Sequence, residues 1–412
     1  MKSILIILIL FSGMGSFAQT LEEYFKVAAD NNPGLLSQYK EFEAALQKVP
    51  QVSTLPDPSL SVSAFGQMVE TRVGPQMARF SLSQMFPWFG TLKAQGDAAT
   101  LMAEAKYQSF LDAQNKLYYD VSAAYFPLYE LQEWIKIEER NVAILESYKT
   151  ITNSKFKNGA GTMVDVLRVD IMLKESQTNL KILNKKSTPL LALFNKLLNR
   201  GELEPVIISD TLVIDPMSLA YAKDSLVVNH PLLNALELRI KAGEASERAA
   251  NKQGLPKLGI GLDYIMVGER TDLAPGVATP PDNGKDAIMP MVSVTLPIFR
   301  RKYRAAVKEA QLMQESYTLQ KTEVTNSLNS NYEMVLFDIR QQTDLISLFD
   351  QQIMESEQAL NLLFRSYSNS GKDFEEVLRM QQQLLKYDKL KISALAQYQI
   401  AVAKLNYITA KK

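Results

Sequence analysis

The sequence predicts an α+β membrane protein in which long helices are joined to a small set of amphipathic strands. Three observations support this fold class: two helical stretches of unusual length, four segments that alternate between apolar and polar side chains, and an order of motifs that occurs twice. The 412 residues include 45 basic and 45 acidic side chains, so the balanced charge gives no indication of a nucleic-acid partner.

Two stretches lack almost all of the residues that interrupt helices. Residues 298–370 contain neither Gly nor Pro, and residues 97–158 are almost as free of them. A helix of the first length would extend roughly 100 Å at about 1.5 Å per residue. Globular helices average about 11–12 residues, so no ordinary globular domain needs such an element.

Both stretches carry the seven-residue apolar repeat of a coiled coil. Such a stripe must face another helix, although Gln342 and Ser356 interrupt it in the second stretch. The repeat alone is equally compatible with a scaffolding coiled coil. The series consist of Tyr107, Val121, Leu128, Ile135 and Val142 in the first stretch, and of Tyr332, Ile339, Ile346, Ile353, Leu360 and Tyr367 in the second.

Four segments alternate with period two and predict strands with one apolar and one polar face. Each has about the 9–11 residues of a tilted transmembrane strand. Their polar positions favour Ser, Gly, Thr and Gln, which a water-filled lumen tolerates. Four strands are too few to close a barrel, and an open edge cannot lie in lipid. We therefore expect several copies to pool their strands, with a small soluble sheet as the alternative. The segments are 59–68, 80–86, 258–266 and 292–298.

The N-terminus has the features of a secretory signal peptide, 1–18. Lys2 precedes an apolar run from Ile4 to Phe11, and Ser16-Phe17-Ala18 provides the small residues that a signal peptidase prefers. The run is shorter than the roughly 20 residues that cross a bilayer as a helix. The sequence therefore predicts an exported mature chain without a transmembrane helix.

Motifs of the first half recur in the same order about 200–210 residues later, which predicts an internal duplication. Asn31-Asn32-Pro33 corresponds to Asn229-His230-Pro231, and Phe86-Pro87-Trp88-Phe89 corresponds to Leu296-Pro297-Ile298-Phe299. The first repeat, 19–200, is expected to contain a helix, a β-hairpin over 58–87, a long helix over 90–157 and a return helix over 162–199. A linker, 201–225, is followed by the second repeat, 226–412, with its hairpin over 257–298 and helices over 300–369 and 373–409.

Residues that would carry catalysis are missing from the sequence. It contains no Cys, which excludes disulfides and thiolate metal sites, and its single histidine, His230, is expected to start a helix before Pro231. No phosphate-binding loop, nucleophile elbow or paired histidine motif is present. We therefore expect no enzyme activity, no cofactor and no assigned metal site.

Aromatic and sulfur-containing side chains gather at the predicted strands. We expect rings at the strand ends to lie at a membrane–water interface, with core packing as the alternative. Thioethers are soft ligands suited to Cu(I) or Ag(I), but methionine is also ordinary apolar filler, which is the favoured interpretation. The residues are the aromatics Phe86, Trp88, Phe89 and Phe299, and the methionines Met68, Met77, Met85, Met266, Met289 and Met291.

With these features in order, the chain resembles the TolC-type outer-membrane factor family over almost the whole mature sequence. The family motif at the end of each long helix is an aromatic residue, two spacers, Gly, five spacers and Asp-Val-Leu. It is complete from Phe156 through Gly159 to Asp165-Val166-Leu167. The second copy, Tyr367 to Leu378, places its Gly one residue late and has Glu instead of Asp. The segments around the first hairpin look most like heavy-metal efflux members.

The resemblance implies a homotrimer in the cell outer membrane. Three chains would form a twelve-stranded β-barrel and a long helical barrel in the periplasm, with the linker and the C-terminal helix as an equatorial region. Such a duct is passive, and it works with a periplasmic membrane-fusion adaptor and an inner-membrane pump, here of the resistance-nodulation-division type. The implied cargo is heavy-metal cations; drug efflux or type I secretion is the alternative. A soluble periplasmic coiled-coil scaffold or adaptor is the alternative of another class.

The resemblance also assigns roles to residues near the turns that follow the long helices. It implies that the helix tips contact the adaptor and that acidic residues form a ring at the channel constriction. Two arginines stand one helical turn after these acids, either as solvated pairs within a helix or as ties between helices that break on opening. The tip residues are Gly159, Gly161, Ser370 and Gly371, and the constriction residues are Asp165, Arg168, Glu376 and Arg379.

Overall fold

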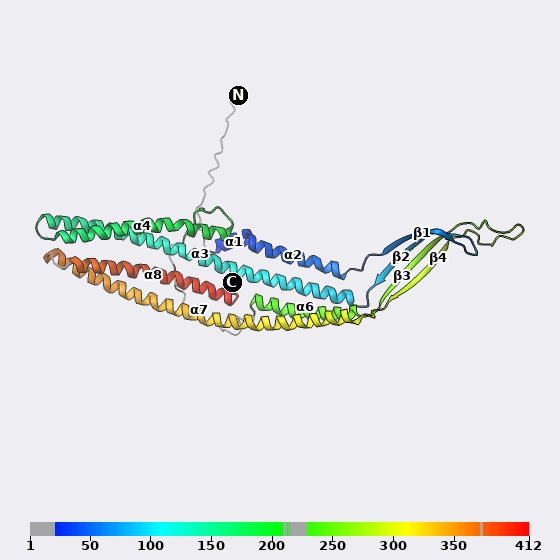
Figure 1. The fold of residues 1–412 in the computed structure, drawn as a ribbon. Coiled ribbons are helices and arrows are strands. Elements are labelled where there is room, and N and C mark those ends of the chain that lie inside the picture. The colour runs from blue at the N-terminus through cyan, green and yellow to red at the C-terminus, as the bar shows by residue number, and fades with distance from the viewer. Residues whose placement is uncertain (1–20, 209–211, 213, 215–228, 371–373, 412) are drawn as a thin grey trace, which may run out of the picture. The chain divides into compact units, whose positions relative to one another are not determined.

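The computed structural model describes residues 21–208, 212, 214, 229–370 and 374–411 (Figure 1). The predicted signal peptide and Gly371 lie outside the described residues, as does most of the linker after residue 208. In chain order, the elements are α1 (Leu21–Asn31), α2 (Pro33–Ser53), β1 (Ser59–Val69), β2 (Gln76–Phe86), α3 (Thr91–Lys157), α4 (Met163–Leu198), α6 (Pro231–Gln253), β3 (Lys257–Val267), β4 (Ala287–Thr295), α7 (Arg300–Ser370) and α8 (Phe374–Ile408).

The long helices α3 and α7 have 67 and 71 residues, and their ends lie within one residue of the predicted ranges. Pro127 lies inside α3 without ending it. Of the predicted seam positions, Val121, Leu128 and Ile339 are buried. The apolar stripes therefore pack against other helices, as their seven-residue spacing predicts.

Proline sets the start of a helix in each half of the chain. Pro33 is the first residue of α2, where the missing N–H costs no helical hydrogen bond. Asn32 caps this start, because its Oδ1 accepts from the N–H of Leu35 at 3.0 Å. Pro231 begins α6 in the same way, directly after His230. The Asn-Pro and His-Pro motifs thus occupy matching positions, while the duplication itself stays a prediction from the sequence.

The strands form an antiparallel sheet in the order β1-β2-β3-β4 (Figure 1). The β1–β2 ladder pairs Leu60 with Leu82, and the β2–β3 ladder pairs Leu82 with Leu262. Both ladders become irregular near the β1–β2 turn. Among the described residues, β1 pairs with β2 alone and β4 with β3 alone, so the sheet has two open edges.

Two compact units divide the chain differently from the predicted repeats. The first contains residues 1–36, 112–230 and 327–412, and the second contains residues 37–111 and 231–326. Each unit therefore takes segments from both halves of the sequence. The sheet belongs to the second unit, and the ends of α3 and α7 that precede the turns belong to the first.

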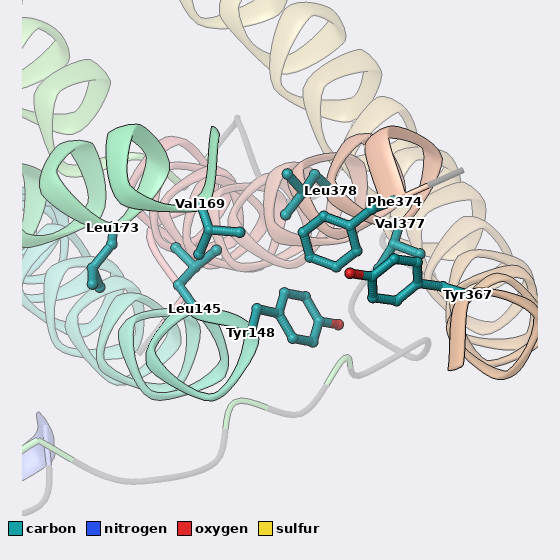
Figure 2. Packing of buried hydrophobic residues seen from close by; sticks show 8 residues of the cluster. All are labelled: Leu145, Tyr148, Val169, Leu173, Tyr367, Phe374, Val377 and Leu378. Carbon is teal, nitrogen blue, oxygen red and sulfur yellow. The ribbon is translucent and has the colours of Figure 1, made fainter. Parts of the chain in front are cut away.

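The core of the first unit is rich in aromatic side chains. Tyr24 of α1 packs edge-on against Phe194 of α4, with ring centroids 5.1 Å apart. A second cluster joins α3, α4, α7 and α8 near their turns, where Tyr367 packs against Phe374 at a centroid distance of 4.4 Å. Figure 2 shows how side chains from all four helices meet there. Its buried members are Leu145, Tyr148, Val169, Leu173, Tyr367, Phe374, Val377 and Leu378.

Candidate functional site

One face of the sheet is apolar and exposed along all four strands. Residues two apart share a face of a strand, and the ladder carries that face from strand to strand. The exposed fraction of its side chains runs from 39% for Leu258 to 77% for Val292. An uncovered aliphatic surface of this extent marks a contact with lipid or with protein. The face comprises Leu60, Val62, Leu82, Leu258, Ile260, Leu262, Tyr264, Ile288, Val292 and Val294.

The opposite face is polar and contains a charged pair. Arg79 of β2 donates a hydrogen bond to the carboxylate of Asp263 on β3, whose side chain is fully buried. The cross-strand neighbours of the pair are Ser63 and Ser81 towards β1 and β2, and Ile265 and Met289 towards β3 and β4. The charged pair and the many small polar positions suit this face to water rather than to lipid. Its other polar and small members are Ser59, Ser61, Ser63, Ser81, Ser83, Gly259, Gly261 and Ser293.

The register also places the methionines of the strands, for which apolar filler is the favoured interpretation. Met266 lies on the apolar face, where it pairs with Ala78. Met68 and Met77 lie where the ladders are irregular, so the register fixes no face for them. The remaining three share the polar face with Asp263: Met85, Met289 and Met291.

The predicted interface aromatics lie at the ends of the strands that lead into the long helices. Phe86 is the last residue of β2, and Phe299 precedes α7. Phe89 and Phe299 are 77% and 78% exposed, so neither ring packs into a core of this chain. Trp88 contacts Phe89 with ring centroids 6.1 Å apart. Their place at a membrane–water interface remains a prediction, and their exposure is what that prediction requires.

The turn between α3 and α4 is built on glycine and on a lysine that reaches α7. Gly159 adopts a φ of 70°, a conformation that glycine tolerates at the end of a helix. The ammonium of Lys155 donates to the carbonyls of Tyr367 at 2.8 Å and Ser368 at 3.1 Å. A cation at the C-terminal end of α7 also complements the helix dipole. Gly161 lies in the same turn, and Ser370 is the last residue of α7.

The four predicted constriction residues make different interactions. Asp165 caps α4 with Thr162 in a reciprocal capping box, so its carboxylate is not paired with Arg168. Arg168 instead forms an ion pair with Glu375 of α8 at 2.9 Å. Glu376 and Arg379 pair with each other within α8. Of the two interpretations, the tie between helices therefore fits Arg168, and the pair within one helix fits Arg379.

A buried polar network, which the seven-residue pattern does not predict, joins α3, α4 and α8. The carboxylate of Glu138 accepts from the hydroxyl of Ser176 and from the ammonium of Lys389. Asn141 donates to Ser176 at 2.9 Å, and Gln381 donates to Asn141 at 3.3 Å. A signal was available, because Glu138 falls three residues after Ile135, at a seam position that apolar residues occupy elsewhere.

The single histidine lies in a buried cluster with Asp112 of α3 and Tyr407 of α8. The Nε2 of His230 is 3.9 Å from the Asp112 carboxylate, to which the Tyr407 hydroxyl donates at 3.5 Å. Burial lowers the pKa of His230 to about 4, although a hydrogen bond with the backbone of Tyr407 acts in the opposite direction. Burial, together with Asp112, raises the pKa of Tyr407 to about 12.

Because of this histidine, we expect the free energy of unfolding to fall at acidic pH. The folded state keeps the imidazole neutral down to pH about 4, whereas the unfolded chain protonates near 6.5. The unfolded state thus binds more protons at this histidine in that window, which lowers stability as the pH drops through it by on the order of 3 kcal/mol. The raised pKa of the buried Asp112 carboxyl acts in the opposite direction and offsets part of this loss. Helical circular dichroism during thermal unfolding, at neutral pH and near pH 4, should show the loss. His230→Asn, which places the residue found at Asn32 of the first half, should reduce the loss of stability between neutral pH and pH about 4. An equal loss in this variant would show that His230 is not its cause.

Two features would bear directly on function in the described part of the chain: clusters of metal-binding side chains and membrane-spanning helices. No group of three or more His, Asp or Glu side chains among them is placed to hold a metal ion. None of the helices in the described part of the chain is both long enough and apolar enough to cross a membrane.

Comparison with protein families gives a match over both halves of the chain. The model of the family described as outer membrane efflux protein matches residues 25–187 and 223–411. The chain belongs to the outer membrane efflux protein family. This membership places the protein in the outer membrane as a component of efflux. A comparison with curated protein sequences finds no match.

Solved structures confirm the TolC-like fold of this outer membrane efflux protein. A membrane protein from Pseudomonas aeruginosa aligns with a TM-score of 0.76 at 18% identity, covering 94% of this chain and 92% of that one. VceC from Vibrio cholerae aligns with a TM-score of 0.74 at 16% identity, covering 94% of this chain and 95% of that one. The MtrE channel from Neisseria gonorrhoeae, in its open state, aligns with a TM-score of 0.72 at 16% identity, covering 94% of this chain and 88% of that one. At these identities the likeness shows the fold alone.

Proposed function

We propose that three copies of this chain pool their strands into a twelve-stranded barrel and act as the outer-membrane exit duct of a tripartite efflux system. The observation that carries the proposal is the exposed aliphatic face on all four strands, together with the two open sheet edges. An open edge cannot lie in lipid, so β4 of one copy would pair with β1 of the next until the sheet closes. The polar face then lines a water-filled interior.

The duct is passive in this proposal and performs no catalysis. A pump of the resistance-nodulation-division type in the inner membrane supplies the energy, and a periplasmic membrane-fusion adaptor joins it to the duct. The adaptor contacts the turns after α3 and α7, around Gly159, Gly161, Ser370 and Gly371. Two observations support this role: Gly159 closes a tight reversal at the end of α3, and Lys155 joins that end to α7 through a hydrogen bond to Tyr367.

Single-channel recording tests the proposal. Purified protein added to a planar lipid bilayer should give stepwise ionic conductance, since a closed barrel provides a continuous aqueous path. A periplasmic scaffold or adaptor would bind or remain dispersed without conducting. Protein that needs no detergent and never conducts would therefore contradict the duct.

The contrast between the two arginines near the tips predicts which one restrains opening. Arg168→Ala removes the tie from α4 to Glu375 of α8 and should raise the mean conductance of the channel. Arg379→Ala is the matched control, because it removes an exposed pair within one helix, which stabilises little. Equal conductance of both variants and the native channel would argue against a restraining tie at Arg168.

An acidic ring at the constriction should favour cations. Glu376 is the stronger candidate for it, because its side chain stays 43% exposed even though it pairs with Arg379, whereas Asp165 is buried in the cap of α4. Glu376→Gln should shift the reversal potential under a salt gradient towards lower cation selectivity. Asp165→Asn should shift it less, and should instead weaken the start of α4. An unchanged reversal potential in Glu376→Gln would remove this residue from the constriction.

For the cargo we propose heavy-metal cations, with drug efflux or type I secretion as the alternative. The resemblance of the first hairpin and its flanking segments to metal-efflux members supports the proposal. A strain without this protein should lose tolerance to copper, silver, zinc or cobalt more than to dyes. Unchanged metal tolerance would favour the alternative and leave the duct itself intact.

A further inference from the structure

We propose that the polar face of the sheet carries a two-coordinate thioether site for a soft monovalent cation such as Cu(I) or Ag(I), formed by Met85 and Met291. The site rests on the proposed duct, because this face lines the interior only when the sheet closes into a barrel. It narrows the proposed cargo from metal cations in general to soft ones.

The two methionines occupy neighbouring rows of the antiparallel ladder. Met85 of β2 pairs with Gly259 of β3, and Met291 of β4 pairs with Gly261. The two glycines are about 7 Å apart along β3. Two thioethers from the two flanking strands thus lie beside one short segment of β3. Met289 shares their face but pairs with Asp263, four residues along β3 from the row of Met85, so it is not part of the site.

The glycines leave the space into which these side chains fold. A Cβ atom added to Gly259 would lie 2.6 Å from Sδ of Met85, and one added to Gly261 would lie 2.9 Å from Cε of Met291. Any larger residue at either position would displace its methionine from above β3. Methionine has three rotatable bonds, so thioethers from both flanking strands can converge over this notch.

The donor chemistry favours a soft cation over a hard one. Thioethers are neutral, polarisable ligands that select Cu(I) and similar ions, whereas Mg²⁺ and Ca²⁺ prefer oxygen. The nearest charges on this face, Arg79 and Asp263, form an ion pair with each other. Weak binding by neutral donors also suits a conduit, since a transported ion must leave each site again.

Apolar filler makes a different prediction, and silver distinguishes the two. The full-length protein in detergent, labelled with carbon-13 at its methionine methyl groups, is titrated with silver nitrate. We expect the methyl signals of Met85 and Met291 to shift and that of Met266, on the apolar face, to stay. The variant Met85→Leu keeps the packing volume and should lose the shift of Met291, because one ligand of the pair is gone. Met266→Leu is the matched control and should keep both shifts.

Zinc sulfate added in place of silver should leave the same signals unchanged. The site is overturned if silver shifts neither signal, if Met266 shifts equally, or if Met291 still shifts in the Met85→Leu variant. Conductance of the same preparation separates this proposal from the duct. Protein that conducts without a silver response overturns the site alone, whereas protein that binds silver at these methionines without conducting overturns the duct alone.

Discussion

Replacing Lys389 with methionine is expected to lower the stability of the helical part by about 3–5 kcal/mol, because it leaves a buried carboxylate without its cation. The side chain of Glu138 is 1% exposed, and that of Lys389 is 24% exposed. After the substitution, Ser176 still donates to Glu138, but no positive charge compensates its burial. The thermal midpoint followed by helical circular dichroism should fall clearly.

Two further variants separate the buried charge from general damage to the packing. The double variant Glu138→Leu/Lys389→Met removes both charges and should recover most of the loss, since well-packed apolar pairs replace buried ion pairs at little cost. Lys174→Met is the surface control: its ammonium is 2.7 Å from Asp170, but its side chain is 74% exposed, so the midpoint should hardly change. A double variant less stable than Lys389→Met alone would show that the network contributes more than charge compensation.

An arginine on the apolar face of the sheet is expected to prevent assembly in the membrane. Val62 of β1 is 63% exposed and pairs with Phe80 on the same face. In a lipid-facing position, Val62→Arg should cost about 2–4 kcal/mol near the middle of the bilayer. The amount of oligomer in outer-membrane fractions should drop sharply, and the variant chain should accumulate as monomer.

The neighbouring residue provides the matched control for this prediction. Ser61 is also exposed, but it pairs with Ser81 on the polar face, where a charged side chain would meet water. Ser61→Arg should therefore assemble at nearly the native level and alter conductance instead. If both arginines were tolerated equally, the apolar face would not contact lipid.

The elements of the fold could be predicted because their signals are local. Alternation along 59–68 and 258–266 places Leu60 and Leu262 on one face of the sheet before any contact is known, since a strand has a period of two. The seven-residue spacing likewise identified Val121 and Ile339 as buried. The spacing of Thr162 and Asp165 is also that of a helix cap, although the family resemblance assigned Asp165 to the constriction instead.

The interactions between distant helices could not be derived in the same way. Lys389 and Glu138 are 251 residues apart, and a glutamate in a coiled-coil seam can be either solvated or paired. The tie from Arg168 to Glu375 depends on which helices become neighbours near the turns, whereas the i, i+3 spacing indicated partners within one helix. The thioether notch depends on the β2–β3–β4 register, because only the paired rows bring Met85 and Met291 beside the two glycines.

The number of chains in the detergent-solubilised complex tests the central claim most directly. Native mass spectrometry of protein extracted from outer membranes should show three copies, because four strands per chain close a barrel only when copies pool them. A single chain that stays dispersed after detergent removal would contradict the account, since its aliphatic sheet face would then need neither lipid nor a partner.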